Sequence, residues 1–458
     1  MFKKKEARIT AAIEAAKPRM SQTQVISLGF FIIITIGTLL LMLPFSAKNG
    51  QPTNFLDALF TATSASCVTG LVTVDTYTHW SLFGQCVILI MIQIGGIGFM
   101  TIATFFLLLI NHRMGLRGRE VLSESISSIQ LGGILGLTKK VVIVTAVFEC
   151  TGAALLMIRF CPQLGFWSGL YVSVFHSVSA FCNAGFDLLG RFGEYSSFVP
   201  YYNDVLVNTV LILLIVIGGL GFLVWDDIIR HGIHFKKYRL HSKIVLTATA
   251  ILLFGGTALL FITEFNAVCK DMTVGERILT ALFGSATART AGFNTVDTGA
   301  LSDGGKLTTI ILMFIGGSPG STAGGIKTTT VFTLLIFAFS YIRRKRTFGV
   351  FGRRLENDAL HKAAAVFFTN LMLILTATLI IVSVDRISLV DTLFETTSAV
   401  ATVGMTTGIT RNLSVVSRIA IIVLMYCGRV GSLSFAGALA ARKEPARIIE
   451  PVEKIIIG

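Results

Sequence analysis

The sequence predicts an all-α integral membrane protein with eight transmembrane helices in four pseudo-repeated units. Three observations predict this fold. The 458 residues are 53% hydrophobic and only 14% charged, whereas soluble domains average about 25% charged residues. Long apolar runs recur along the chain, and a short glycine-ended motif occurs four times, with its glycines 115, 107 and 112 residues apart. A soluble globule of this composition would expose too much apolar surface.

Eight apolar runs are candidate spans, because most approach the ~20 residues that a helix needs to cross a bilayer. They lie near residues 25–43, 86–110, 141–158, 205–225, 244–262, 308–339, 363–384 and 415–440. Of the 39 Lys and Arg residues, 27 lie in segments 1–24, 111–140, 230–243, 342–362 and 440–458. These segments are every second loop and both ends of the chain. Because Lys and Arg concentrate in the cytoplasmic loops of membrane proteins, this pattern predicts cytoplasmic termini. The net charge of +14 is thereby explained by membrane topology, and no nucleic-acid partner is expected.

Each unit is expected to contain a span, a short outer loop, a pore-loop segment and a second span. We expect a cytoplasmic N-terminal segment at 1–20, unit one at 21–112, unit two at 138–232, unit three at 241–345, unit four at 360–442 and a cytoplasmic tail at 443–458. Four walls around one axis would build a central pore within a single chain.

The four motif segments are Phe60–Leu71, Phe175–Phe186, Phe283–Phe293 and Phe394–Met405. They are too short and too polar to span, so each is expected to be re-entrant. Non-helical backbone at membrane depth persists only when it is buried in protein or lines a water-filled cavity. The stretches Leu56–Ser66 and Leu393–Val400 are expected to be half-helices that enter from outside. Three carboxylates near the starts of such half-helices are candidate caps, because the helix dipole favours negative charge there: Asp57, Glu276 and Asp391.

The residues at and before the four glycines predict a cation filter made of backbone carbonyls. Such rings replace the hydration shell of potassium, and glycine permits the dihedrals that point successive carbonyls one way. The candidate filter residues are Val68, Thr69, Gly70, Asn183, Ala184, Gly185, Thr290, Ala291, Gly292, Thr402, Val403 and Gly404. None is a carboxylate, which disfavours divalent cations. The alternative is that the four glycines only reverse the direction of the loops. Arg289 lies beside the third filter segment, where a salt bridge holding the loop is its simplest role.

A second motif, a glycine pair or its variant, follows each filter glycine by 25, 33, 24 and 24 residues. In units one and two we expect it to serve small-residue helix packing. In unit three it opens a stretch with five glycines and a proline, which cannot hold a regular helix. We predict an intramembrane gating loop made of Gly316, Gly317, Ser318, Pro319, Gly320, Ser321, Thr322, Ala323, Gly324 and Gly325. The alternative is a simple helix kink. A phosphate-binding loop is excluded, because no strand precedes the stretch.

Arg429 replaces the second glycine of this motif in unit four. A charge at this depth is costly and usually faces a cavity or a partner. We expect it to lie level with the gating loop and to restrain cation flow. The alternative is a structural ion pair with Glu149, another charge in mid-span.

These repeats make the whole chain resemble the Trk/Ktr/HKT superfamily of potassium transporters. Within it, the chain looks most like the KtrB branch, the membrane subunits of bacterial Ktr systems. In the family, serine in place of the first filter glycine is associated with sodium permeation, so Gly70 implies potassium selectivity. The resemblance further implies a homodimer in the bacterial plasma membrane, sodium-stimulated uptake, and a cytoplasmic ring of RCK subunits that binds ATP or ADP and controls the gate.

Other functional classes are less consistent with the sequence. A sodium-permeable or sodium-coupled secondary transporter is the main alternative, but such folds usually show inverted repeats, whereas all four units here start and end inside. A membrane enzyme would need a cluster of acids and histidines in the spans, and His176 stands alone. We therefore expect no enzymatic activity and no organic cofactor, with potassium as the substrate and sodium as a possible activator.

Overall fold

The computed structural model describes residues 21–98, 101–102, 104, 122–123, 134–345 and 347–432. Within them, α-helices dominate, and a single two-stranded antiparallel hairpin joins β1 (Gly349–Val350) to β2 (Arg353–Arg354). The expected N-terminal segment 1–20, the end of unit four at 433–442 and the tail 443–458 lie outside the described residues, as do 99–100, 103 and 105–112 in unit one.

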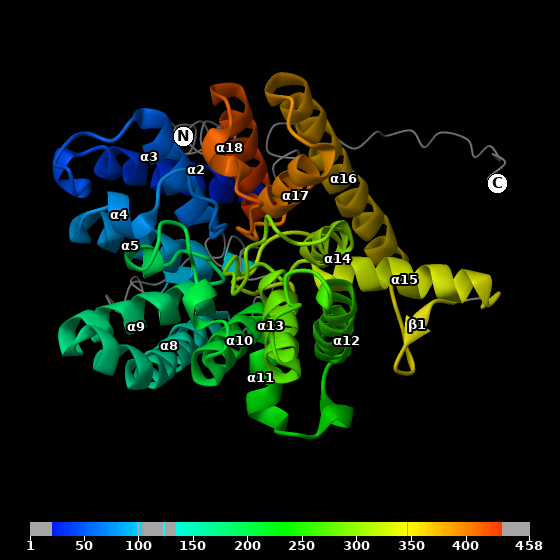
Figure 1. The fold of residues 1–458 in the computed structure, drawn as a ribbon. Coiled ribbons are helices and arrows are strands. Elements are labelled where there is room, and N and C mark those ends of the chain that lie inside the picture. The colour runs from blue at the N-terminus through cyan, green and yellow to red at the C-terminus, as the bar shows by residue number, and fades with distance from the viewer. Residues whose placement is uncertain are drawn as a thin grey trace, which may run out of the picture.

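The twelve main helices form four groups of three, and within each group every helix packs on the other two. Each group has a first helix, a shorter second helix and a third helix (Figure 1). The groups are α2 (Gln22–Leu41), α3 (Phe55–Cys67) and α5 (Leu82–Ile97); α8 (Ile134–Leu164), α9 (Phe166–Phe181) and α10 (Val205–Leu220); α12 (Leu240–Glu264), α13 (Val274–Thr287) and α14 (Asp303–Phe314); and α16 (Asn357–Asp385), α17 (Leu389–Val400) and α18 (Val415–Val430). The shorter helices α3 and α17 contain the expected half-helices at 56–66 and 393–400.

The remaining elements are short or peripheral. They are α4 (Thr76–His79), α11 (Phe222–His231), α15 (Thr328–Ile342) and the 3-10 turns η1 (Pro44–Ser46), η2 (Leu189–Arg191), η3 (Val199–Tyr201), η4 (Phe235–Lys237) and η5 (Ile409–Asn412). Helix α15 extends away from the bundle (Figure 1). The hairpin folds back toward α15, where Phe348 packs edge-to-face on Phe337 with ring centroids 5.6 Å apart.

All three carboxylates lie in the first turns of their half-helices, as the dipole argument expects, but only Glu276 takes part in a hydrogen-bonded cap. Glu276 completes a capping box with Thr273 at the start of α13, and the bonds from Thr273 lower the pKa of Glu276. Asp57 instead pairs with Arg418 at 2.9 Å, and Asp391 pairs with Lys306 at 3.0 Å. These two ion pairs tie groups one and three to group four, an inter-group role that local sequence cannot reveal.

In groups one, two and four, the third helix ends at a glycine that lies three residues after the first glycine of the second motif. Gly98, Gly221 and Gly431 have φ values of 89°, 99° and 93°, a region that other L-residues adopt only at a cost. Helix α10 ends at this point, and α11 continues at an angle of 98° to it. In group three, the segment between α14 and α15 has no helical turn at all.

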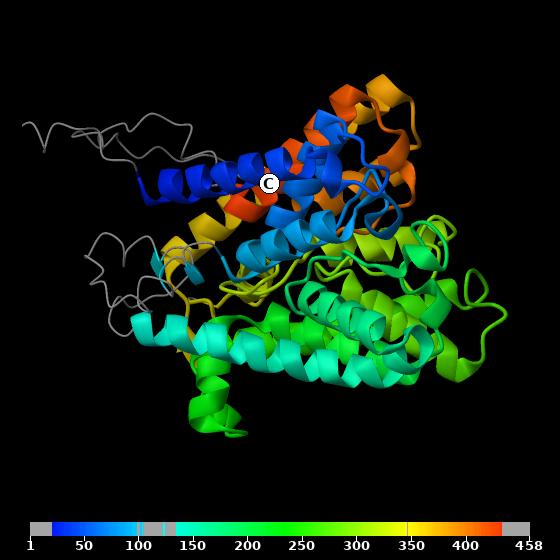
Figure 2. The same ribbon diagram turned by 90° about the vertical axis from the view of Figure 1, so that its left-hand side faces the viewer.

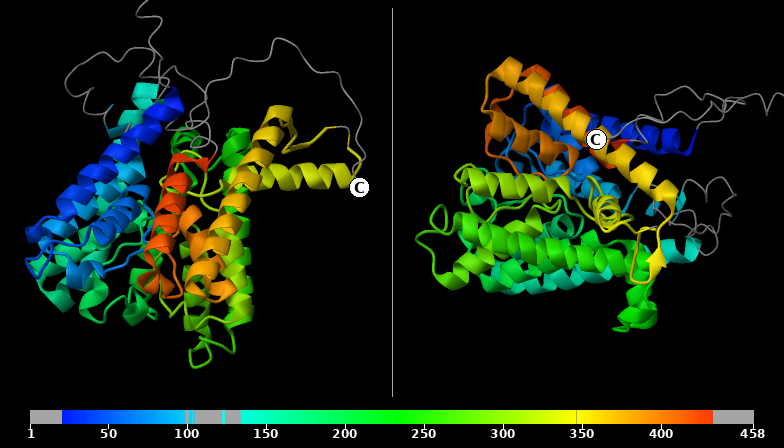
Figure 3. Two further views of the ribbon diagram at one scale, coloured as in Figure 1. Left: turned by 90° about the horizontal axis from the view of Figure 1, so that it is seen from above. Right: turned by 90° about the vertical axis from the view of Figure 1, so that its right-hand side faces the viewer.

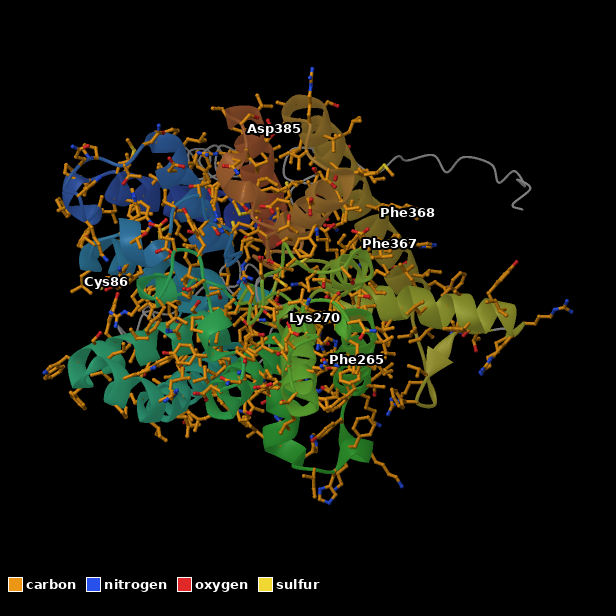
Figure 4. All side chains as sticks on the ribbon, viewed as in Figure 1. Cys86, Phe265, Lys270, Phe367, Phe368 and Asp385 are labelled. Carbon is orange, nitrogen blue, oxygen red and sulfur yellow. The ribbon has the colours of Figure 1, made fainter. Side chains whose placement is uncertain are left out.

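Four described helices are long and apolar enough to cross a membrane, namely α2, α8, α12 and α16, or five if α10 and α11 count as one span. Their outward faces carry bare apolar side chains, among them Phe31, Ile158, Phe254 and Leu379, each at least 60% exposed. Figures 2 and 3 show these helices around the outside of the bundle, and Figure 4 shows Phe368 on α16. An apolar exterior of this extent is typical of a protein surrounded by lipid.

Candidate functional site

The four motif loops meet in a closed ring. Each filter glycine packs so tightly on the next loop that a methyl group would not fit. A methyl on Gly70, Gly185 or Gly292 would lie 2.6, 2.7 or 2.5 Å from the carbonyl oxygen of Ala184, Ala291 or Val403, and one on Gly404 would collide with the carbonyl of Thr69. The contacts thus run from loop one to two, to three, to four and back to one. Segments more than 100 residues apart in the chain therefore converge on one point.

All four loops share an uncommon backbone pattern. Two residues before each glycine, a non-glycine residue has positive φ: Val68 at 58°, Asn183 at 58°, Thr290 at 79° and Thr402 at 51°. The glycine itself is also at positive φ in every loop. Non-glycine residues rarely adopt this region, and such strain gathers at functional sites. Four independent copies of one strained tripeptide therefore mark this ring as the candidate functional site.

A hydroxyl side chain braces each loop, a feature that the sequence analysis missed. Ser64 Oγ accepts a hydrogen bond from Gly70 N at 3.0 Å, and Ser398 Oγ accepts one from Gly404 N at 3.1 Å. In the other two loops, Ser179 and Thr287 donate to the carbonyls of Phe186 and Phe293, both at 2.7 Å. The signal was present as a Ser or Thr six residues before the glycine, or five in unit three.

The third loop is one residue tighter than the others. Ala291 N donates to the carbonyl four residues back at 2.9 Å, whereas Thr69, Ala184 and Val403 reach five residues back. Arg289 is 6% exposed, and its guanidinium contacts Thr249 Oγ1 at 3.4 Å. Within the described chain it forms no salt bridge, so the expected ion pair is wrong. Instead, Asn183 of loop two meets Thr290 Oγ1 of loop three at 3.1 Å.

A polar cavity of about 450 Å³ opens on one side of the ring. All four filter glycines line it, together with the residues that follow them in the chain. Asp75, Asp187 and Asp297 contribute three carboxylates to its wall, and Arg411 contributes one guanidinium. Arg411 lies 3.6 Å from the ring centroid of Tyr195, so it is held at the wall by a cation–π contact. The balance of charge in this cavity favours cations.

The glycine-rich segment 316–325 closes on the opposite side of the ring, against residues that precede the glycines. A methyl on Gly324 would collide with Thr402, and one on Gly325 would lie 3.0 Å from Ala401. Thr322 Oγ1 donates to the Phe181 carbonyl at the end of α9 at 3.1 Å. The segment therefore touches the ring directly at loops two and four.

Backbone hydrogen bonds hold this segment in one conformation. Its ends come together in a β-bridge between Ile315 and Ile326. Ser318 N donates to Gly219 O at 3.1 Å, and Phe222 N donates to Gly320 O at 2.7 Å. The segment is thus an ordered loop docked on the junction of α10 and α11, and a simple kink between two helical halves does not describe it.

Arg429 lies level with this loop, as the motif register predicts. Its guanidinium donates to the carbonyls of Thr322, Gly95 and Gly96. Glu149, the alternative partner, instead accepts from Gln93 Nε2 at 3.0 Å and contacts Cys182. Arg429 therefore joins the loop of group three to α5 of group one through main-chain oxygens.

Sequence reasoning also missed Lys327, which follows the loop directly. Lys327 Nζ donates to Ala323 O at 2.7 Å, so a second basic side chain lies at the loop.

His176 is wholly buried, and its ring bonds the Val172 carbonyl at 2.8 Å and the Leu188 amide at 3.1 Å. Among the described residues, no cluster of three or more His, Cys, Asp or Glu side chains could hold a metal ion.

Comparison with known proteins agrees with this architecture. The family model described as TrkH, cation transport protein, matches residues 9–448. The chain is 40% identical over 457 residues to the potassium/sodium uptake protein NtpJ of Enterococcus hirae, covering 98% of this chain and all of that one. It is 37% identical to the Ktr system potassium uptake protein B of Bacillus subtilis, covering 96% and 97% of the two chains.

A solved structure shows the same fold. The potassium transporter TrkH of Vibrio parahaemolyticus superposes with a TM-score of 0.72 at 17% identity, covering 93% of this chain and 86% of that one. The family model and the relatives place the chain in a class of multi-pass membrane proteins that transport cations and are not enzymes. The chain belongs to the TrkH cation transport protein family.

Proposed function

We propose that this protein is the ion-translocating membrane subunit of a potassium uptake system. The observation that carries the proposal is the closed ring of four glycine loops. Positive φ at two positions in each loop supports a filter in which backbone carbonyls take the place of the hydration shell. The relatives named for potassium uptake support potassium as the substrate.

The four groups of three helices support eight spans in four repeated units around one pore. In this arrangement α14, the loop and α15 form one interrupted span. The other seven spans are α12 and the first and third helices of groups one, two and four. The basic segments support a cytoplasmic location for both termini. The polar cavity is then the outer vestibule, and the glycine-rich loop lies on the cytoplasmic side of the filter.

The loop 316–325 and Arg429 form the gate of this proposal. The loop covers the inner end of the ring, and Arg429 binds the Thr322 carbonyl and so holds the loop there. Arg429 lies on the ion path below the filter, with the basic side chain of Lys327 nearby, and its positive charge opposes the passage of another cation. Opening requires the loop to break its hydrogen bonds with Gly219, Phe222 and Arg429.

We propose that partner proteins control this gate. The relative from a Ktr system supports a multi-component assembly. We propose a homodimer that binds a cytoplasmic ring of RCK-type subunits, whose exchange of ATP for ADP moves the loop. Sodium would act as an activator of uptake.

Potassium or rubidium isotope uptake into liposomes tests the proposal, with sodium as a competitor. We expect saturable uptake that excess sodium does not suppress. Equal sodium and potassium flux would contradict the selectivity. It would favour the second candidate, a sodium-permeable or sodium-coupled cation transporter. This candidate is supported by the Enterococcus hirae relative, which is named a potassium/sodium uptake protein.

A further inference from the structure

Helix α11 leaves the bundle at an angle of 98° to α10, at the end of the molecule where α8 begins (Figure 2). Its first half is buried, but the apolar side chains of its last turns and of the following loop are bare. Ile228, Ile229 and Ile233 are 36%, 59% and 96% exposed. An amphipathic helix that lies across the direction of the spans, at their end, has the geometry of an interfacial helix.

The acidic residues of α11 are already neutralised within the protein. Asp226 pairs with Lys140 at 2.9 Å and with Arg230 at 2.8 Å. Asp227 is buried, pairs with Arg239 at 3.5 Å and accepts from Ser242 Oγ at 2.6 Å. The outward charge of this region is therefore basic.

The free positive charge lies next to the bare isoleucines. Lys236 and Lys237 are exposed, and neither forms a salt bridge with any described residue. Residues 222–243 contain five Lys and Arg against two Asp, a net charge of +3. Apolar side chains beside uncompensated lysines match the two components of an anionic bilayer surface, its acyl chains and its headgroups.

The other end of α11 is bonded to the loop that covers the ring. Phe222 N, the first amide of α11, donates to Gly320 O at 2.7 Å. A methyl on Gly221 would lie 2.7 Å from Pro319 O. No side chain or solvent layer separates α11 from the loop, so a change in the position of the helix must displace the loop or break this bond.

We propose that residues 228–237 bind the anionic phospholipids of the cytoplasmic leaflet, and that α11 transmits this binding to the loop 316–325. Lys236 and Lys237 contact the headgroups, while Ile229 and Ile233 enter the acyl region. The second part rests on the proposed function, in which the loop is the gate. The occupant is a lipid surface rather than a soluble protein, because the bare isoleucines lie at the edge of the membrane-crossing helices.

Hydrogen exchange of the full-length protein tests the binding without reference to transport. The protein is reconstituted into phosphatidylcholine vesicles with or without an equal share of phosphatidylglycerol. We expect the amides of 228–237 to exchange more slowly with phosphatidylglycerol. Lys236→Gln together with Lys237→Gln should weaken this protection about 25-fold, at about fivefold per lysine. Lys270→Gln, on the loop after α12 (Figure 4), is the matched control and should keep the protection. Equal exchange in both lipid mixtures overturns the proposal.

Rubidium uptake in the same vesicles tests the transmission. Wild-type uptake should depend on phosphatidylglycerol, and this dependence should disappear in the double lysine variant. If phosphatidylglycerol protects the amides of 228–237 but uptake does not depend on it, the binding stands and the transmission to the loop is wrong. Absence of uptake by every variant in every lipid would instead contradict the proposed function, while the exchange experiment still decides the binding. A tightly bound soluble protein recovered with 228–237 protected in pure phosphatidylcholine would also overturn the lipid assignment.

Discussion

At the residue scale, the ring depends on positions where any side chain is excluded. Gly404 has a φ of 91°, and a methyl group on it would collide with the carbonyl of Thr69 and lie 2.9 Å from Cα of Gly70. Gly408 has a similar φ of 97° but has open space around its Cβ position. A side chain at either glycine would strain the backbone to the same extent, but only a side chain at Gly404 would force the neighbouring loop to move. Comparing substitutions at the two positions therefore separates local backbone strain from distortion of the filter.

We expect Gly404→Ala to abolish selective potassium uptake, because the added methyl pushes loop one out of the ring. Gly408→Ala pays the same positive-φ cost of about 1–2 kcal/mol but should keep selectivity. Rubidium uptake with sodium competition measures both. If the two variants lose selectivity to the same extent, strain alone is responsible and the ring geometry is not.

Arg429 shows why the kind of cation matters. Its planar fork reaches carbonyls on two different helix groups at once, a geometry that an ammonium group cannot reproduce. We expect Arg429→Ala to raise the basal cation flux, because the loop loses a tether and the path loses a charge. Arg429→Lys keeps the charge and should show an intermediate flux. A lysine variant as leaky as the alanine variant would assign the effect to bonding and not to charge.

At the element scale, each half-helix holds its loop by a hydroxyl from its last turns. Ser398 Oγ accepts from the buried Gly404 amide, which would otherwise have no partner. Leaving a buried polar group unpaired costs about 1–3 kcal/mol. Ser173 on α9 is equally buried but bonds only the Gly169 carbonyl of its own helix, so it provides a comparison within the same kind of element.

We expect Ser398→Ala to lower potassium affinity and to destabilise the protein by about 1–3 kcal/mol, because the Gly404 amide is left unpaired. Ser173→Ala should have a much smaller effect on both quantities. Thermal unfolding in detergent and concentration-dependent rubidium uptake are the measurements. An unchanged affinity in Ser398→Ala would mean that the half-helix positions the loop without this hydroxyl.

The glycine-rich loop is suited to deletion because its two ends are neighbours. Ile315 and Ile326 already form a β-bridge, and a methyl on Gly316 would lie 3.2 Å from Ile326 O. We expect deletion of Gly317–Gly325 to raise cation flux, since the cover of the ring is removed. Gel filtration and hydrogen exchange of α13 and α17 confirm that the variant is folded. Unchanged flux in a folded variant would show that the loop is not the gate.

At the scale of the whole molecule, the distribution of charge predicts its orientation. Lys270 lies after α12, the first helix of group three, and Lys345 lies after α15. In a variant without the seven native cysteines, we expect Lys270→Cys to react with an impermeant maleimide in intact cells. Lys345→Cys should react only after permeabilisation, because basic segments stay inside. The reverse pattern would invert the topology and place the polar cavity on the cytoplasmic side.

Much of the molecule could be predicted from local patterns. Apolar length indicates the long helices, and the repeated motif indicates the loops, the glycines of the ring and the level of Arg429. The partners of charged residues could not be predicted. Asp57 and Asp391 pair with Arg418 and Lys306 from other groups, and Arg289 has no salt bridge within the described residues. The pairing of charged residues depends on which helix groups lie side by side. Local sequence does not show this, because the groups are formed by segments far apart in the chain.

The sequence by itself determined the membrane environment, the fourfold repetition and the positions where only glycine fits, because each follows from composition or from short-range backbone sterics. Only the tertiary structure decided the cyclic order of the loops, the docking of the glycine-rich loop on α10 and α11, and the carbonyl partners of Arg429. It also decided that the third helices stop at Gly98, Gly221 and Gly431. The physical reason is that these outcomes arise from contacts between distant segments, and such contacts leave no periodic signal in any one of them.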